Sequence, residues 1–254
     1  MSEEKKSEGL TRREFIRNGS FAVGGLVGGT LLGSFLINPS SSTQTASENG
    51  NGDHDHGSSD DYMRARMFFK RQEDFRVLSA AVERIFPEDE IGPGAVSLAV
   101  PYFIDRQLAG SWGFNAREYM DGPFEDGAET QGNQSALNRR DAFLKGVRLI
   151  QNQAKANFEG EAYYDLTDEQ QDEILESFES GDVEMRGMSS SQFFELLRKA
   201  TLRGVYSDPV YGGNLNMDGW RMKQYPGGLM NNMDIIEDEE FHDIEPVSLH
   251  DHHT

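Results

Sequence analysis

Cysteine is absent from all 254 residues of this chain. Disulfide bonds, thiolate metal sites, iron–sulfur clusters and cysteine-linked haem are therefore excluded. Basic residues are also scarce, because 24 Lys and Arg stand against 44 Asp and Glu and give a net charge of -20. Nucleic-acid binding and docking on an anionic membrane surface both need clustered basic side chains. The composition opposes both functions.

Histidine is missing from the part of the chain that can form a packed domain. The six histidines are confined to polar tracts near the two ends, as His54, His56, His242, His250, His252 and His253. Histidine is the commonest general acid–base residue and a common metal ligand. No nucleophile–base pair, phosphate-binding glycine loop or HExxH motif is present, and none of the many carboxylate pairs stands out. We therefore expect no catalytic residue, cofactor site or metal site in this chain.

The N-terminal segment carries the pattern of a twin-arginine (Tat) export signal. Arg12 and Arg13 follow a threonine, and Phe15 stands two residues after the pair, before an aliphatic residue and a third arginine. The uncharged stretch 19–37 contains six glycines, which keep its hydrophobicity as modest as is typical of Tat signals. We expect the Tat translocase as a partner and a location outside the cytoplasm, in the periplasm or on the outer face of the cytoplasmic membrane.

The same stretch has a second interpretation as a permanent membrane helix. Its 19 residues are just long enough to cross a bilayer, and no Ala-x-Ala cleavage site is evident. The segment contacts the membrane at least transiently in both cases, so cleavage and anchoring are left as alternatives. The Tat route carries folded proteins that have usually acquired a cofactor or a partner. Because this chain has no cofactor motif, a partner is expected.

Composition divides the rest of the chain into three parts. Residues 38–66 are rich in Ser, Thr, Asn, Gly and Asp and are too polar to pack, so they form a linker after the signal segment 1–37. Residues 67–230 contain regularly spaced apolar side chains and form the domain. Residues 231–254 hold eight acids and no Lys or Arg, and disorder is expected there.

The domain is expected to be all-α, an irregular helical bundle with long loops. Apolar residues recur at helical spacing, and no segment alternates with the period of two that a strand requires. Thr167 with Gln170, and Ser189 with Gln192, have the spacing of capping boxes, which start helices. Helices are expected at 72–86, 95–109, 135–158, 167–178 and from 189 onward. Residues 110–132 are rich in Gly and acids and form a long loop, whose aromatic side chains either meet a partner or fold back onto the core.

A glycine-punctuated motif follows the last helix, reading GVYSDPVYGGN over residues 204–214. Gly204 is expected to close the helix, and Asp208 with the following proline sets a turn. The Gly212–Asn214 run permits positive backbone dihedrals and close backbone approach. Aromatic residues farther along, including Trp220, either form a recognition surface or hold this segment against the chain's own helices. The residues expected at a partner interface are Tyr206, Asp208, Pro209, Tyr211, Gly212, Gly213, Asn214 and Trp220.

This motif, followed by Gly219-Trp220 and Pro226-Gly227, resembles the signature of the gluconate 2-dehydrogenase subunit 3 family, the small subunit or gamma chain. The resemblance covers approximately residues 75–227. It implies a non-catalytic subunit that accompanies a large FAD-dependent dehydrogenase of the GMC type, frequently with a cytochrome c subunit. FAD and the oxidation of a sugar or sugar acid then belong to the partner. In that family the small subunit often bears the only Tat signal and carries the flavoprotein across the membrane.

Two other functions compete with this interpretation. A stand-alone exported or membrane-tethered binding protein would explain the signal segment without an enzyme partner. An independent hydrolase with paired carboxylates is least favoured, because the sequence marks no such pair.

Overall fold

The computed structural model describes residues 65–125, 134–228, 237 and 242–250. These ranges contain six α-helices and no β-strand, so the all-α prediction is confirmed. The export segment with Arg12, Arg13 and Phe15, and nearly all of the polar linker, lie outside the described residues. Among the helices that the structure does describe, none has both the length and the apolar character needed to cross a membrane.

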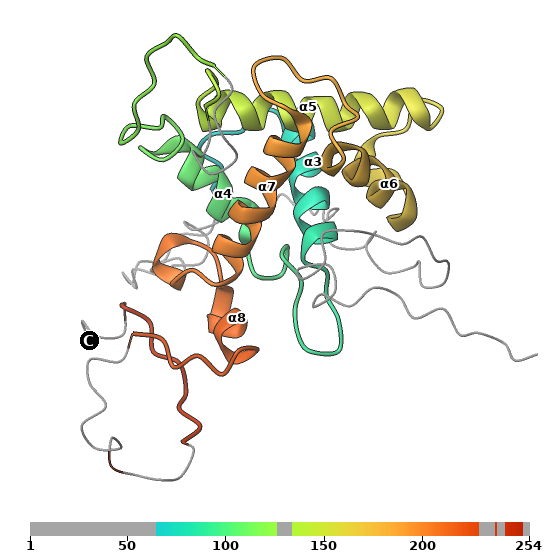
Figure 1. The fold of residues 1–254 in the computed structure, drawn as a ribbon. Coiled ribbons are helices and arrows are strands. Elements are labelled where there is room, and N and C mark those ends of the chain that lie inside the picture. The colour runs from blue at the N-terminus through green and yellow to red at the C-terminus, as the bar shows by residue number, and fades with distance from the viewer. Residues whose placement is uncertain (1–64, 126–133, 229–236, 238–241, 251–254) are drawn as a thin grey trace, which may run out of the picture.

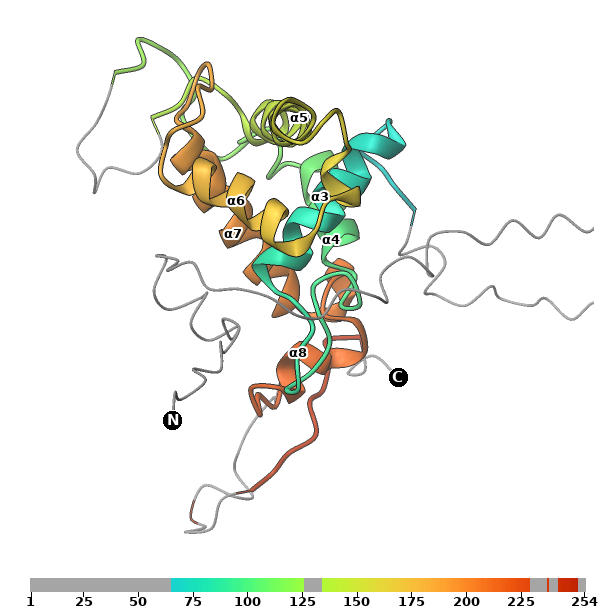
Figure 2. The same cartoon turned by 90° about the vertical axis from the view of Figure 1, so that its right-hand side faces the viewer.

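The five long helices form a bundle with one helix lying across the others (Figure 1). Helices α3 (Gln72–Ile85) and α7 (Ser190–Val205) occupy its centre, and α4 (Val100–Ala109) and α6 (Asp168–Glu179) pack on α7 from either side. Helix α5 (Arg139–Asn157) crosses one end, and Figure 2 shows it nearly end-on. The short helix α8 (Asp218–Arg221) lies at the opposite end of the molecule in both views.

Aromatic side chains from three helices meet in the core. The ring of Phe193 on α7 lies edge-to-face against Phe143 on α5 and Phe178 on α6, with centroid distances of 5.9 and 6.0 Å. All three side chains are fully buried. Gly146 lets α5 approach this ring closely, because a Cβ atom there would lie 2.1 Å from Phe193 Cζ. Apolar residues that recur at helical spacing in this helix, such as Phe143, Val147 and Ile150, lie on the face that it buries.

Both predicted capping boxes are present. The Thr167 side chain accepts a hydrogen bond from the amide of Gln170, and the Gln170 side chain accepts one from the amide of Thr167. Ser189 and Gln192 exchange the same pair of bonds at the start of α7. These bonds satisfy amide groups that a helix N-terminus leaves without intrahelical partners, so each helix begins at the predicted residue.

Two helices begin later than their apolar patterns predicted. Helix α4 starts at Val100 rather than at residue 95, because Ala99 has a left-handed conformation with φ 59° and Pro101 stands in the first turn. Helix α5 starts at Arg139 rather than at residue 135. Its cap is Asn138, and Ser135 instead donates its hydroxyl to the carbonyl of Gly187 at 2.7 Å.

A buried carboxylate holds the beginning of the domain. Asp105 on α4 is fully buried and accepts hydrogen bonds from the amides of Met67, Phe68 and Phe69, at 2.8 Å for Phe69. A carboxylate that accepts several amide bonds can remain buried because its charge is solvated by peptide dipoles. The segment that follows the linker is thereby fastened to the bundle.

The loop after α4 contributes to the core and to the surface. Trp112 packs toward Phe143 with a ring separation of 6.2 Å. Phe114 and Tyr119 are 56% and 83% exposed. Of the two alternatives left by the sequence, folding back onto the core therefore holds for Trp112 but not for Phe114 or Tyr119.

Candidate functional site

The motif of residues 204–214 begins inside α7. Gly204 does not close this helix as predicted, because α7 runs to Val205 and is capped at Tyr206. The glycine instead allows α4 to approach, since a Cβ atom there would lie 2.8 Å from Val100 Cγ1 and 3.0 Å from Phe103 Cδ1. Its role is helix packing rather than chain reversal.

The next residues form a tight turn that returns to the end of α7. Asp208 caps a 3₁₀ turn, Pro209–Tyr211, by accepting the amide of Val210 at 3.0 Å. Gly212 follows with φ 91°, a conformation that glycine adopts at little cost. A Cβ atom on Gly213 would lie 2.4 Å from the carbonyl oxygen of Gly204, so a larger residue does not fit. The predicted positive dihedral and close approach are both confirmed.

Two buried side chains then fasten the turn to α8. Asn214 is fully buried at φ 51° and donates its amide to the carbonyl of Ser207 at 2.8 Å. Its oxygen accepts the amide of Gly219 at 2.7 Å. Trp220 is 6% exposed, and its indole N–H donates to the carbonyl of Tyr206 at 2.9 Å. We call residues 206–228, which these bonds hold together, the C-terminal lobe.

The structure separates the predicted interface residues into internal and external ones. The side chains of Asn214 and Trp220 serve the lobe itself, and Gly212 and Gly213 are buried. Tyr211 is 51% exposed, and the remaining three are half-buried: Tyr206, Asp208 and Pro209. The external surface of the motif therefore consists chiefly of the 3₁₀ turn.

Half of the exposed large apolar side chains in the described ranges belong to this end of the molecule. Residues of the α3–α4 connection lie against the lobe, because the amide of Leu215 donates to the carbonyl of Leu98 at 3.3 Å. Ten large apolar side chains are exposed in the described ranges, and five of them belong to the lobe or to this connection: Ile91, Val96, Val210, Tyr211 and Tyr225. We call these five the lobe patch. A concentration of exposed apolar residues is typical of an interaction surface.

The acidic C-terminal extension also reaches the motif, which the sequence did not predict. Disorder was expected for residues 231–254, but residues 242–250 lie against the lobe. Ser248 is 5% exposed and donates its hydroxyl to Asp208 at 2.9 Å, and the amide of Leu249 donates to the same carboxylate at 2.9 Å. We call residues 242–250 the strap. Most other residues of the extension lie outside the described ranges.

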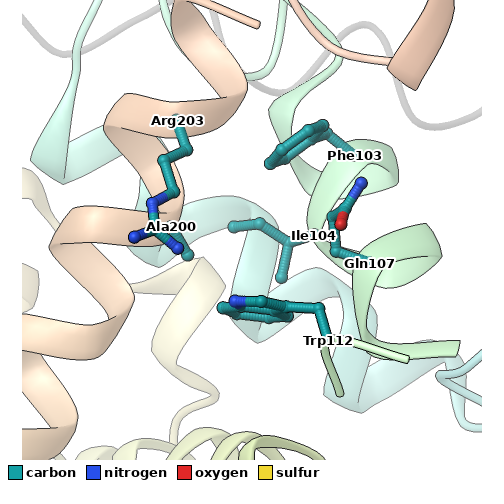
Figure 3. A pocket seen from close by; sticks show the side chains of 6 residues that line it. All are labelled: Phe103, Ile104, Gln107, Trp112, Ala200 and Arg203. Carbon is teal, nitrogen blue, oxygen red and sulfur yellow. The ribbon is translucent and has the colours of Figure 1, made fainter. Parts of the chain in front are cut away.

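Two hollows lie in the described part of the bundle. One lies between α4 and α7, has a volume of about 60 Å³, and is lined by Phe103, Ile104, Gln107, Trp112, Ala200 and Arg203 (Figure 3). A shallower one of about 290 Å³ opens to solvent beside α5, around Lys145, Arg148 and Arg186. Sites for small molecules usually enclose roughly 300–1,000 Å³. The first hollow has room only for water.

The charged groups of the bundle serve as links between helices. Arg84 on α3 makes a two-pronged bond to Asp172 on α6, at 2.9 and 2.6 Å, and also pairs with Asp168. Burial lowers the pKa of Arg84, but these two carboxylates outweigh that effect and raise it above its usual value.

Burial raises the pKa of Glu176 and of Glu179 on α6, but neither residue lines either hollow. In the described ranges, no group of three or more acidic or histidine side chains is placed to hold a metal ion.

The model of the gluconate 2-dehydrogenase subunit 3 family matches residues 72–227, from the first residue of α3 to Gly227 in the lobe. The chain belongs to this family. The match spans the bundle and the whole motif, so the resemblance read from the motif is confirmed. No curated protein and no solved structure matches the chain at a significant level. The family name describes one subunit of a multi-subunit gluconate 2-dehydrogenase, and the chain is accordingly an accessory subunit of a dehydrogenase.

Proposed function

We propose that this subunit is non-catalytic, that it binds an FAD-dependent dehydrogenase of the GMC type in the cytoplasm, and that it carries this partner through the Tat translocase. The partner oxidises a sugar or sugar acid, and a cytochrome c subunit completes the complex in some members. The observation that carries the proposal is the family match across the bundle and the lobe. Arg12 and Arg13 support the export step independently of it.

The surface we propose for the flavoprotein is the lobe patch. Protein interfaces concentrate their binding energy in a few aromatic and apolar side chains surrounded by polar ones. Tyr211 suits this role, because its backbone is fixed between the Asp208 cap and Gly212 while half of its side chain remains exposed. A rigid aromatic side chain loses little conformational entropy on binding.

The export step is tested by changing Arg12 and Arg13 to Lys in the full chain co-expressed with the flavoprotein. We expect both proteins to remain in the cytoplasm, because the arginine pair defines the signal. The matched control is Arg17→Lys in the same segment, which should leave export intact. Normal export of the flavoprotein beside the double variant would disprove the carrier role.

The docking surface is tested by co-purification of the two chains. Tyr211→Ala should weaken flavoprotein binding by about 10-fold or more, the range expected for an aromatic interface residue. Tyr119→Ala is the control, since that tyrosine is 83% exposed but belongs to the loop after α4. Equal affinity of the two variants would place the interface elsewhere.

A further inference from the structure

The strap pairs with the last residues that the family has in common. The family match ends at Gly227, and the strap lies entirely beyond it. The amide of Val247 donates to the carbonyl of Pro226 at 3.1 Å, and the carbonyl of Val247 accepts the amide of Gly228 at 2.9 Å. These two bonds form one rung of a parallel β-ladder between Gly227 and Val247.

The lobe is shaped for this contact. Gly227 has φ 77°, and a Cβ atom there would lie 2.3 Å from the carbonyl oxygen of Val247 and 2.8 Å from the ring of Trp220. A larger residue would therefore push the strap away. Glycine at such a position indicates that a second backbone must approach closely.

The Asp208 carboxylate extends the contact along the strap. One oxygen accepts the Ser248 hydroxyl and the amide of Val210, and the other accepts the amide of Leu249. Together, Asp208 and the backbone of residues 226–228 form an edge that binds the strap by its main chain and by one hydroxyl group. We call this the lobe edge.

Most of the strap is not buried. Of its nine residues only Pro246 and Ser248 are buried. Its ion pair joins Arg221 to Glu245, whose side chain is 85% exposed, and exposed pairs contribute little because solvent screens them. The strap therefore buries little surface that a competing segment with the same backbone chemistry would have to match.

We propose that the lobe edge is a peptide-binding site for an extended segment of the flavoprotein, added as a β-strand, and that the strap occupies this site until the flavoprotein binds. The preferred segment has a Ser or Thr where the strap has Ser248, because that hydroxyl donates to Asp208. Main-chain pairing supplies affinity in this mode of recognition, and side-chain contacts supply specificity. The identity of the partner rests on the proposed function, whereas the binding mode rests on the lobe edge.

The first experiment needs no flavoprotein. A fluorescent peptide with the sequence of residues 243–250 is titrated against the full chain, against a Val247→Pro/Ser248→Ala variant, and against Asp243→Asn as a control in the same segment. The double variant loses one amide donor and one hydroxyl donor to the lobe edge. It should bind the peptide at least about 10-fold more tightly than the other two chains, because its own strap competes less well. Equal binding, or no binding by any chain, would overturn the proposal.

A second peptide examines the role of the hydroxyl group. The same sequence with Ser248 replaced by Ala should bind the double variant several-fold more weakly than the first peptide does. Equal affinities would show that Asp208 does not recognise the hydroxyl group of Ser248.

The flavoprotein then provides the remaining test. On binding, the amides of Val247 and Leu249 should exchange faster with solvent, while the amide of Gly228 stays protected by a new partner. Binding that leaves the strap amides protected would overturn the proposal but not the carrier function. Absence of binding would contradict the proposed function, and the peptide titration would still decide whether the lobe edge is a peptide site.

Discussion

The helical bundle and the C-terminal lobe differ in the contacts that join their parts. In the bundle, contacts such as those of Phe193 with Phe143 and Phe178 join the helices through apolar surface. In the lobe, Asn214 and the Trp220 indole fasten the chain through hydrogen bonds to backbone groups. The lobe also contains four non-glycine residues at positive φ, namely Asn214, Asn216, Met217 and Gln224.

This difference shows that the two parts are stabilised in different ways. Apolar burial is non-directional and sums over many atoms, so it stabilises the bundle without depending on one bond. The conformation of the lobe instead depends on a few directed bonds that hold an otherwise unfavourable backbone. Parts held in this way open locally at a lower free energy than a packed core. The exchange of the strap for a partner segment that we propose at the lobe edge requires a region that opens at such a low free energy.

The largest effect is expected from removing the central aromatic side chain of the bundle. Phe193→Ala should lower the free energy of unfolding by about 3–5 kcal/mol, because it leaves a cavity among fully buried rings. Urea denaturation followed by circular dichroism measures this loss. Phe114→Ala, at a side chain 56% exposed, is the control and should change stability little.

A smaller and more local effect is expected in the lobe. Asn214→Ala should destabilise the lobe by roughly 2–4 kcal/mol, because the buried amide of Gly219 and the half-buried carbonyl of Ser207 lose their partner. Hydrogen exchange should accelerate at Gly219 while the amides of α5 stay protected. Asn216→Ala is a matched control, since Asn216 also has a left-handed φ of 57° but is exposed. Similar losses for both variants would mean that backbone conformation, not the buried bonds, holds the lobe.

Adding volume in the bundle should lower the free energy of unfolding by less than removing an aromatic ring does. Gly146→Ala should lower stability by about 1–3 kcal/mol, because the new methyl group overlaps the Phe193 ring. Combining it with Phe193→Leu should recover part of the loss, which a double-mutant cycle measures. Gly110→Ala is the control, as its Cβ would meet nothing nearer than 3.7 Å. Simple additivity would contradict the close approach of α5 to this ring.

The smallest effect concerns the two ends of α6. Burial raises the pKa of Glu179 in the last turn, whereas its own backbone amide and the Thr167 side chain lower the pKa of Glu169 in the first turn. At neutral pH, Glu179→Gln should therefore raise stability by a few tenths of a kcal/mol, since a negative charge at a helix C-terminus is unfavourable and solvent screens it. Glu169→Gln should lower stability.

The pH dependence of these two variants distinguishes them. For Glu179, the folded-state pKa exceeds the unfolded value near 4.5, so its contribution to stability is present below that value and is lost as the pH rises through the folded pKa. For Glu169, the contribution is present above 4.5 and is lost as the pH falls through the lowered folded pKa. Both differences from the unaltered chain should vanish in acid. Thermal unfolding at several pH values would show differences of the same sign at both ends if helix position does not matter.

Much of the fold could be predicted from short-range patterns. The capping boxes at Thr167 and Ser189 depend on bonds between residues three apart, and the buried face of α5 follows from helical periodicity. The late start of α4 could not be predicted, because the segment before Ala99 has the apolar character of a buried helix. It turns instead, so that the amide of residue 95 meets the end of α3. The role of Gly204 could not be predicted for a related reason. In the sequence, a glycine that lets a neighbouring helix approach cannot be told from a glycine that ends its own helix.

The candidate site divides in the same way. Residue order alone indicates a turn at Asp208, a positive dihedral at Gly212 and an accessory subunit of this family, because these features depend on local chemistry and on a contiguous motif. Tertiary structure alone decides that Asn214 and Trp220 face inward, that Tyr211 faces outward, and that the C-terminal extension returns to the motif. The bond from Ser248 to Asp208 joins residues 40 positions apart. No periodicity or spacing encodes such a contact, because it exists only when the folded lobe presents Asp208 and the backbone of Gly227 side by side.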